Sequence, residues 1–579
     1  MLFGVLLVSL VASIFELASV ASILPFMAMV MNTDGGFGQR ILNFLAQHGV
    51  EGRTNGLIIV GLATVVAICA GNAASALNQW VQLKFLARVR RQLTHELFEG
   101  YLRQPYLFHV ARDSSSLAKL VIQDVQLAVL GYMNSVLGFI SRSFVTFALV
   151  ALIILQDPFV ALGVVVVMGG TYGAVYFFAK EKLNALGQQI MLAGDARHRI
   201  VYESLGGVKE LIVLGRTTDA VAELDTETRA ITQAEIVSSL TGMMPRYALE
   251  TIAFGGIVAI TLLLLMRGDA QSAIPTLALY AFAGYRILPA IQQLYASAVN
   301  IKFFTPSVAN LERDLELVKT SVPQAGSAPM ISSFDKAISF RNVVFGYPAA
   351  NRPAIDGVST EIRRNESIGL VGKTGSGKTT FVDLLLGLYS PNSGKITVDG
   401  TTLTSANAKS WRRHIGYVPQ HIFLKNASIL ENIALGVSKT KIDRSAAEQA
   451  ARMAQADEFI VLLPNGYDTV VGERGVKLSG GQRQRLGIAR ALYLNPDVIV
   501  FDEATSALDG VTETAVMDAV RSLSGTRTII LIAHRLRTVQ TCDRILMLEA
   551  GRIVADGSYE ELLSNSLPFR RLAGQAGNT

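Results

Sequence analysis

The stretch Gly372–Thr380, GKTGSGKTT, contains the residue types that bind a phosphate chain. Its glycines let backbone N–H groups close around a β-phosphate, Lys378 offers charge to the β- and γ-phosphates, and Thr379 offers a hydroxyl to Mg²⁺. An apolar strand pattern precedes the stretch and a helical pattern follows it, as a phosphate-binding loop requires. We therefore expect these residues to form the loop: Gly372, Lys373, Thr374, Gly375, Ser376, Gly377, Lys378, Thr379 and Thr380.

Two carboxylates end a second apolar strand, in the sequence DVIVFDEATSALD. Asp502 and Glu503 leave the strand at its carboxyl end, the edge at which ligands bind in parallel α/β sheets. Asp502 suits the Mg²⁺ shell, and Glu503 is placed to polarise an attacking water. A strand ending in Asp-Glu is weak evidence alone, but it is strong evidence downstream of a phosphate loop.

A second anion-binding element lies in KLSGGQRQRLGIARAL, from Lys477 to Leu492. A Ser-Gly-Gly turn that opens a basic helix presents backbone N–H groups and a helix N-terminus to an anion. One chain therefore has two phosphate-binding elements that are well separated in sequence.

The chain around these motifs divides into two parts. Mean hydropathy of +0.38 over 579 residues is too high for an ordinary soluble protein. We expect a six-span membrane domain at 1–305, a linker at 306–336 and an α/β nucleotide-binding domain at 337–575. A span takes about 20 helical residues, and the apolar runs that meet this length lie near Leu2–Met31, Asn55–Val81, Leu130–Gln156, Phe159–Ala179, Tyr247–Met266 and Ile274–Asn300.

Basic residues set the orientation of these runs. They concentrate after the second and fourth runs, so the positive-inside rule predicts two long cytoplasmic excursions and both chain ends in the cytoplasm. The net charge of +6 belongs to these loops, and we expect no nucleic-acid partner. Cys69 and Cys542 lie far apart and in no metal-ligand pattern.

The α/β part resembles the nucleotide-binding domain of ABC transporters over Ile338–Arg571. The defining motif of that family, LSGGQ, is present, and VGERG resembles the loop that contacts the coupling helices in exporters. The resemblance implies ATP and Mg²⁺ as cofactors and a signature site that serves a second subunit, formed by Leu478, Ser479, Gly480, Gly481 and Gln482.

Further residues of this chain match single positions of the family pattern, in the same order along the sequence. Tyr347 resembles the aromatic that stacks on adenine, and Gln420 the glutamine that touches Mg²⁺ and senses the membrane domain. Asp509 fits the D-loop, and His534 the switch histidine that contacts the γ-phosphate. Glu503, Gln420 and His534 would thus be catalytic, and Thr379, Gln420 and Asp502 would bind the metal.

Family geometry implies that ATP lies between the phosphate loop of one domain and LSGGQ of another. This chain has one of each, so two sites need two chains and a homodimer of twelve spans. Coupling between ATP and the membrane would run near Tyr106–Ser115 and Leu211–Val221. An ATP-gated channel is the alternative from another class, and the intact Glu503 favours turnover instead.

The fused membrane part resembles the type IV exporter arrangement. MMPRYALETIAFGGIV and YRILPAIQQLY resemble bacterial flippases of lipid-linked oligosaccharides. The implied function is ATP-driven export or flipping of an amphipathic anionic lipid across the bacterial inner membrane. The first choice is a polyprenyl-pyrophosphate-linked oligosaccharide, and a lipid A-type or multidrug exporter is the alternative.

Charged residues within the predicted spans are candidates for substrate binding. Glu16 lies in the first span, Arg286 in the sixth and Arg246 near the cytoplasmic end of the fifth. One possibility is a buried pair of Glu16 with Arg286, because lone intramembrane charges are costly. The other is that Arg286 and Arg246 bind an anionic head group such as a pyrophosphate, which guanidinium groups can bond bidentately.

Overall fold

The computed structural model describes residues 2–30, 37–49, 52–156, 166, 169–266, 270–320, 329–348, 350–503, 517–518, 520–533 and 535–576. The chain divides into two compact units. The first consists of Met1–Gln104 and His109–Val322, and the second of Pro105–Phe108 and Pro323–Thr579.

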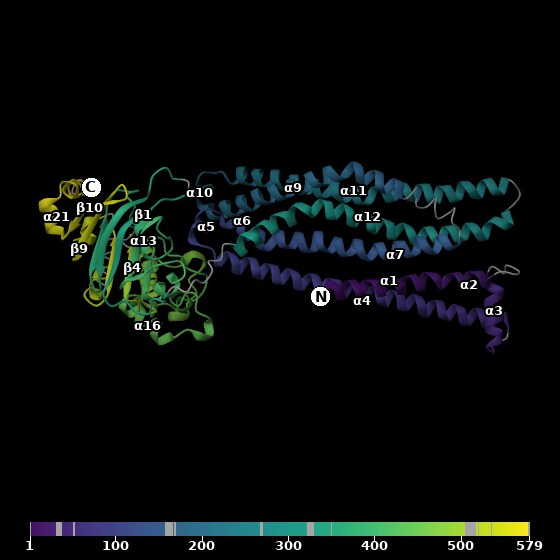
Figure 1. The fold of residues 1–579 in the computed structure, drawn as a ribbon, viewed down its shortest axis with the longest axis horizontal. Helices are drawn as coiled ribbons and strands as arrows, with labels where there is room; N and C mark the ends of the chain where they lie inside the picture. The colour runs from purple at the N-terminus through teal and green to yellow at the C-terminus, as the bar shows by residue number, and fades with distance from the viewer. Residues whose placement is uncertain are drawn as a thin grey trace. The chain divides into compact units, whose positions relative to one another are not determined.

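The first unit is helical, and its long helices run alongside one another in Figure 1. Each predicted span overlaps one or two of these helices, although the start of the fourth span lies outside the described residues. The helices are α1 (Leu2–Ala21), α2 (Ile23–Val30), α3 (Phe37–Gln47), α4 (Arg53–Leu102), α6 (Ser114–Lys119), α7 (Asn134–Gln156), α9 (Gly170–Gly206), α10 (Val208–Val213), α11 (Thr217–Met266) and α12 (Ala270–Thr320), with π-helical η1 (Leu120–Asp124) and η2 (Leu127–Met133).

Within the described residues, three helical stretches are long and apolar enough to cross a membrane. Together with the helical runs at the other predicted positions, they confirm the predicted class of the first unit, an α-helical membrane domain. The three stretches are Leu2–Ala21, Arg53–Leu102 and Ser114–Ala151.

Glycines allow these helices to cross closely. A Cβ added at Gly71 of α4 would lie 2.8 Å from Cβ of Ser19 of α1, and one added at Gly187 of α9 would lie 2.1 Å from the carbonyl oxygen of Phe303 of α12. Small residues at crossings are the usual means of helix association in membranes, where burial against lipid gives little driving force.

A polar cluster joins α1, α4 and α7 within the apolar helices. The Ser9 hydroxyl donates to Oδ1 of Asn78 at 2.9 Å, and Nε2 of Gln82 donates to the Ser9 hydroxyl at 3.1 Å. Nδ2 of Asn78 in turn donates to the Ser141 hydroxyl at 3.4 Å. The cluster satisfies polar groups that would otherwise be costly in hydrocarbon.

The second unit contains two sheets. The six-stranded sheet has the order β10-β9-β3-β8-β7-β6 and is parallel except for the antiparallel pair β9 and β10; the four-stranded sheet, β2-β1-β4-β5, is antiparallel. The strands are β1 (Ala337–Phe345), β2 (Ile355–Arg363), β3 (Ser367–Val371), β4 (Ser393–Val398), β5 (Thr401–Thr402), β6 (Ile415–Val418), β7 (Val498–Asp502), β8 (Thr528–Ile532), β9 (Arg544–Glu549) and β10 (Arg552–Gly557).

Apolar side chains fill both faces of the parallel sheet. All residues of β3, β7 and β8 are buried, as their largely apolar sequences predict for a sheet covered on both sides. Val498 and Val500 of β7 join one core cluster, whereas Ile499 and Phe501 join the other. The alternation follows from the two-residue repeat of a strand.

Helices cover these faces and connect the strands. Together with the sheets they form the predicted α/β class of the second unit. The helices are α13 (Lys378–Leu385), α14 (Ala408–Trp411), α15 (Ile429–Ile433), α16 (Arg444–Met453), α17 (Asp457–Ile460), α18 (Gly480–Leu492), α20 (Leu536–Val539), α21 (Tyr559–Asn565) and α22 (Leu567–Ala576), with 3₁₀ turns η4 (Arg412–His414), η5 (Lys439–Lys441), η6 (Gly466–Asp468) and η7 (Glu473–Gly475). The short helix α5 (Tyr106–Val110), between α4 and α6 along the chain, is divided between the two units.

Residues 306–336, the expected linker, are divided between the two units. Helix α12 continues to Thr320, and the chain from Pro329 onward is tied to the second unit. The Asp399 carboxylate accepts hydrogen bonds from three consecutive backbone N–H groups, those of residues 335, 336 and 337, at 2.6–2.9 Å. Nδ2 of Asn407 donates to the carbonyl oxygen of Pro329 at 3.1 Å. The entry to β1 is thus fixed by side chains.

Candidate functional site

The phosphate loop connects β3 to α13, as the sequence predicts. Lys373, Thr374 and Gly375 form its turn. Gly372 has φ +149°, and a Cβ there would lie 2.2 Å from the carbonyl oxygen of Leu548; Gly377 has φ +105° and the same conflict with Ala354 at 2.5 Å. Only glycine fits at these two positions, because both the backbone angle and the space exclude a side chain.

Lys378 and Ser376 lie buried inside this loop. Nζ of Lys378 donates to the carbonyl oxygens of Gly372 at 2.8 Å and Lys373 at 3.1 Å. Burial lowers the pKa of its ammonium group, and the carboxylates of Glu503 and Asp502 oppose this effect. Within the part of the chain that the structure describes, Oγ of Ser376 has no hydrogen-bond partner. A buried hydroxyl without a partner, beside a buried cation, fits the phosphates of ATP.

The two predicted carboxylates stand at the end of β7. The Tyr417 hydroxyl donates to Oδ2 of Asp502 at 3.3 Å, and Nε2 of Gln420 donates to Oε2 of Glu503 at 2.6 Å. Thr379 is the second residue of α13. Its hydroxyl and the oxygens of Asp502 and Gln420 are the hard donors that Mg²⁺ prefers.

Asp383 is a buried carboxyl that the sequence analysis missed. It lies in α13, and burial, aided by the charge of Asp502, raises its pKa to about 6. An Asp inside a helical apolar pattern carries no local signal of this kind, because the effect depends on its neighbours in the fold.

Aromatic side chains pack around Tyr347, the residue expected to stack on adenine. The hydroxyls of Tyr347 and Thr380 lie 3.1 Å apart, which ties the aromatic to the first turns of α13. Tyr389 packs edge-on against Tyr347, with ring centroids 5.8 Å apart, and stacks on Phe345 at 5.0 Å. Tyr347 is therefore held by its neighbours beside the phosphate loop.

The LSGGQ motif forms the start of α18. Ser479 caps the helix: its Oγ accepts from the backbone N–H of Gln482 at 3.2 Å, and Oε1 of Gln482 accepts from the backbone N–H of Ser479 at 2.9 Å. Gly480 and Gly481 form the first turn, and the carbonyl of the buried Leu478 accepts from Arg483 at 2.8 Å. The capping box leaves the glycine N–H groups of the first turn at a helix N-terminus, where an anion is favoured.

Three predicted residues cannot be placed. Asp509 and His534 lie outside the described residues. Arg286 belongs to α12, but its side chain also lies outside what the structure describes.

Glu16 and Arg246, the other two candidate charges, each form an ion pair. Glu16 of α1 pairs with Arg142 of α7, at 3.5 Å between Oε1 and Nη1, and each side chain is about one-third exposed or less. Arg246 pairs with Glu250, one turn along α11, at 2.5 Å between Nε and Oε1. Arg142 was missed, although a lone cation in the apolar run Leu130–Gln156 is a signal that could have revealed it.

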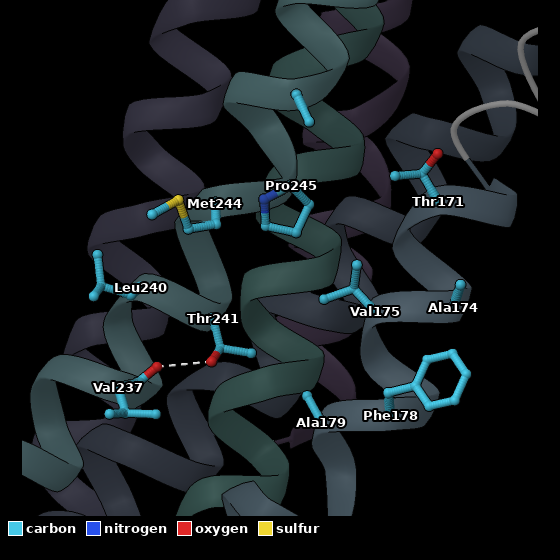
Figure 2. Close-up of a pocket in the computed structure, with 11 residues that line it drawn as sticks. Thr171, Ala174, Val175, Phe178, Ala179, Val237, Leu240, Thr241, Met244 and Pro245 are labelled. Carbon is cyan, nitrogen blue, oxygen red and sulfur yellow. Dashed lines mark hydrogen bonds between the residues drawn. The ribbon is translucent and has the colours of Figure 1, made fainter.

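A cavity of about 770 Å³ lies between α9 and α11 (Figure 2). Its lining is almost wholly apolar and includes Val175 and Phe178 of α9 and Leu240, Met244 and Pro245 of α11. Arg246 follows Pro245 directly, but one residue turns a helix by about 100°, so the guanidinium leaves α11 away from the cavity face.

Comparisons with known proteins match both units. Residues 6–292 match the ABC transporter transmembrane region, and residues 355–506 match the ABC transporter family model. The ATP-dependent lipid A-core flippase of Saccharophagus degradans is 30% identical over 531 residues, covering 90% of this chain and 87% of that protein.

Of two further matches, one covers only part of the chain and the other is a solved structure that covers nearly all of it. The leukotoxin translocation ATP-binding protein LktB of Mannheimia haemolytica is 48% identical over 229 residues, covering 40% of this chain and 32% of that protein. The solved structure of a bacterial Atm1-family ABC exporter with ATP bound has a TM-score of 0.79 at 25% identity and covers 99% of this chain and 97% of its own.

Proposed function

Because the chain belongs to the ABC transporter family, with membrane and nucleotide-binding domains fused in one chain, we propose that it flips an amphipathic anionic lipid across the bacterial cytoplasmic membrane. The family membership makes it an ATPase coupled to transport. The cargo that we propose first is a polyprenyl-pyrophosphate-linked oligosaccharide.

The proposed ATP chemistry uses residues already described. Lys378, Ser376 and the loop N–H groups would hold the phosphates, and Tyr347 would stack on adenine. Thr379, Asp502 and Gln420 would hold Mg²⁺, which supplies charge neutralisation at the β- and γ-oxygens when bound. Glu503 would orient and polarise the attacking water, and its bond to Gln420 fixes the carboxylate for this role.

We also propose that two copies of the chain form the transporter. The phosphate loop follows β3 and the LSGGQ motif begins α18, so one chain supplies each element once. A second copy would complete each ATP site with its own LSGGQ and its Asp509, while His534 would contact the γ-phosphate from the first.

The observation that carries the cargo proposal is the arginine of the PRYALE stretch, Arg246, which is placed on α11 next to the apolar cavity of α9 and α11 but on another face. Arg246 is bonded to Glu250 and leaves α11 away from the cavity. In this proposal an anionic head group replaces Glu250 as its partner, since guanidinium bonds phosphate bidentately, and the apolar lining takes the hydrocarbon tail. Arg286 and Glu16 would belong to the same substrate path.

The relatives named as lipid A-core flippases favour a second candidate of related chemistry. Lipid A-core, like the first candidate, joins phosphorylated sugars to hydrocarbon chains. The two proposals therefore share the anionic glycolipid head and differ in the tail.

ATPase stimulation in proteoliposomes tests both. Polyprenyl-pyrophosphate-linked oligosaccharide, lipid A-core and a neutral glycolipid would be compared at equal content. Stimulation by the first alone supports our first choice, stimulation by lipid A-core supports the second, and stimulation by the neutral lipid alone contradicts both. Arg246→Ala and Arg286→Ala should reduce stimulation and flipping more than Arg246→Lys and Arg286→Lys, whereas unchanged flipping in all four variants would exclude a head-group role.

A further inference from the structure

One buried carboxylate joins three separate stretches of the first unit. Asp314 lies near the end of α12, and its side chain is only 7% exposed. Oδ2 accepts from the Tyr101 hydroxyl at 2.5 Å and from Nη1 of Arg112 at 3.1 Å, and Oδ1 lies 3.3 Å from the same nitrogen. Tyr101 belongs to the last turn of α4, and Arg112 lies between α5 and α6.

The two helix ends that meet here are packed closely. A Cβ added at Gly100, next to Tyr101, would lie 1.9 Å from Cγ1 of Val318. At the rim, Lys319 and Glu96 form an exposed pair at 3.9 Å. The Asp314 cluster is therefore the charged centre of a tight crossing, and a buried charge of this kind depends strongly on its partners.

Along the chain, two residues of the cluster flank a segment that belongs to the other unit. Pro105–Phe108 groups with the nucleotide-binding unit, where the ring of Tyr106 lies 5.8 Å from that of Tyr389 and Leu107 packs against the core of the sheets. Tyr101 precedes this segment by four residues along the chain, and Arg112 follows it by four. Both neighbours of the segment thus bond the same carboxylate.

We propose that Asp314 is a positioning residue for the coupling of ATP hydrolysis to membrane movement. Through Tyr101 and Arg112, it fixes both ends of Pro105–Phe108 to α12, so a displacement of the segment moves the last membrane helix. A carboxylate suits this task because its negative charge strengthens the bonds from both the hydroxyl and the guanidinium, whereas a neutral amide would not offset the charge of Arg112. The proposal holds for any cargo and does not depend on the proposed lipid.

The test needs separate readouts of the two units. The full chain in lipid nanodiscs would carry Thr54→Cys, at the predicted outer start of α4, in a background of Cys69→Ser and Cys542→Ala. Vanadate-sensitive ATPase activity reports the nucleotide-binding unit. The change in labelling rate of the new thiol by a polar maleimide, upon addition of ATP and vanadate, reports the membrane unit.

Asp314→Asn and the milder Tyr101→Phe should keep ATPase activity within about twofold and lose about fivefold or more of the ATP-dependent labelling change. Asp314→Glu should recover part of that change. Glu99→Gln is the matched control, because it removes a 2.5 Å pair with Arg103 on the exposed side of the same helix end. It should leave both readouts unaltered.

Two results would overturn the proposal. One is a wild-type labelling change in both Asp314→Asn and Tyr101→Phe. The other is a parallel fall of ATPase activity, labelling change and melting temperature in both variants. That result would show that the cluster only stabilises the fold.

Discussion

The side-chain amide of Gln420 donates a hydrogen bond to Oε2 of Glu503, with 2.6 Å between the two atoms. The two residues follow β6 and β7, which are parallel neighbours, so strand pairing brings their positions together. Glu503 has φ +51°, a left-handed conformation that is uncommon for a residue with a side chain. This backbone turn comes immediately after the strand ends, at the residue that bonds Gln420.

Replacing Glu503 by Gln should abolish turnover while preserving ATP binding. The amide keeps an oxygen for Gln420 but cannot polarise water, and general-base catalysis contributes about 10²- to 10⁴-fold. Steady-state ATPase activity and bound nucleotide after rapid desalting measure the two effects. Glu560→Gln, an exposed carboxylate of α21, is the control.

The Glu503→Gln variant also distinguishes a pump from a gated channel. Transport by Glu503→Gln at the wild-type rate, with hydrolysis lost, would show that ATP binding alone opens a path and would contradict the transporter mechanism.

Ser376→Ala should change stability and ATP affinity in opposite directions. The buried hydroxyl has no partner within the described residues, so its removal should stabilise the nucleotide-free protein by about 1 kcal/mol. If the hydroxyl bonds a phosphate, the KM for ATP should rise about tenfold. Melting temperature without nucleotide and ATPase titration measure these effects.

Ser564→Ala, at an exposed position of α21, is the control for that experiment. An unchanged KM in Ser376→Ala would remove the hydroxyl from the phosphate site.

The variants Tyr347→Phe and Tyr347→Ala should differ sharply in their KM for ATP. The phenyl ring keeps the stacking surface and loses only the hydroxyl contact with Thr380. Base stacking on an aromatic contributes about 1–3 kcal/mol, so the alanine variant should raise the KM for ATP about 5- to 160-fold. Equal KM values for the two variants, by ATPase titration, would show that the ring does not bind adenine.

Asp383 gives the protein a pH-dependent stability. Its pKa of about 6 in the folded protein lies above the ordinary value, so the folded state binds the proton more tightly. The stabilising contribution is complete below pH about 4 and is lost as pH rises through about 6. Asp383→Asn should therefore stabilise the protein at pH 7.5 by about 1–3 kcal/mol.

Melting temperatures of the full chain between pH 4 and 8 check this prediction. The difference between variant and wild type should shrink towards pH about 4. A constant difference across the range would assign the effect to packing, and Asp518→Asn, an exposed partner of Arg521, is the control.

Local motifs explain why much of the ATP site was predictable. A phosphate loop depends on neighbouring residues along the chain, so Gly372–Thr380 and the strands around it follow from sequence. The end of β7 follows similarly, because its apolar run marks the strand and the carboxylates mark its end. The roles proposed for Gln420 and Tyr347 needed the family resemblance, since one glutamine or one tyrosine has no local signature.

For residues that act through distant neighbours, the identity of the partner was not predictable. Asp383, Arg142 and Asp314 owe their properties to partners more than 100 residues away or to burial by the whole sheet. The pairing of Glu16 with Arg142 shows the same limit. Two charges within apolar runs suggest a pair, but helix packing decides which cation lies opposite.

The three backbone hydrogen bonds to Asp399 determine where the ATPase part of this chain can best be exchanged for that of a relative. They and Asn407 hold the path from Pro329 into β1, while α12 ends at Thr320. A recombination junction placed between these two positions would sever no side-chain anchor described in the structure. Exchange of whole ATPase modules between related half-transporters is thus best made there, and a cut at the first residue of β1 would leave the Asp399 carboxylate without two of its donors.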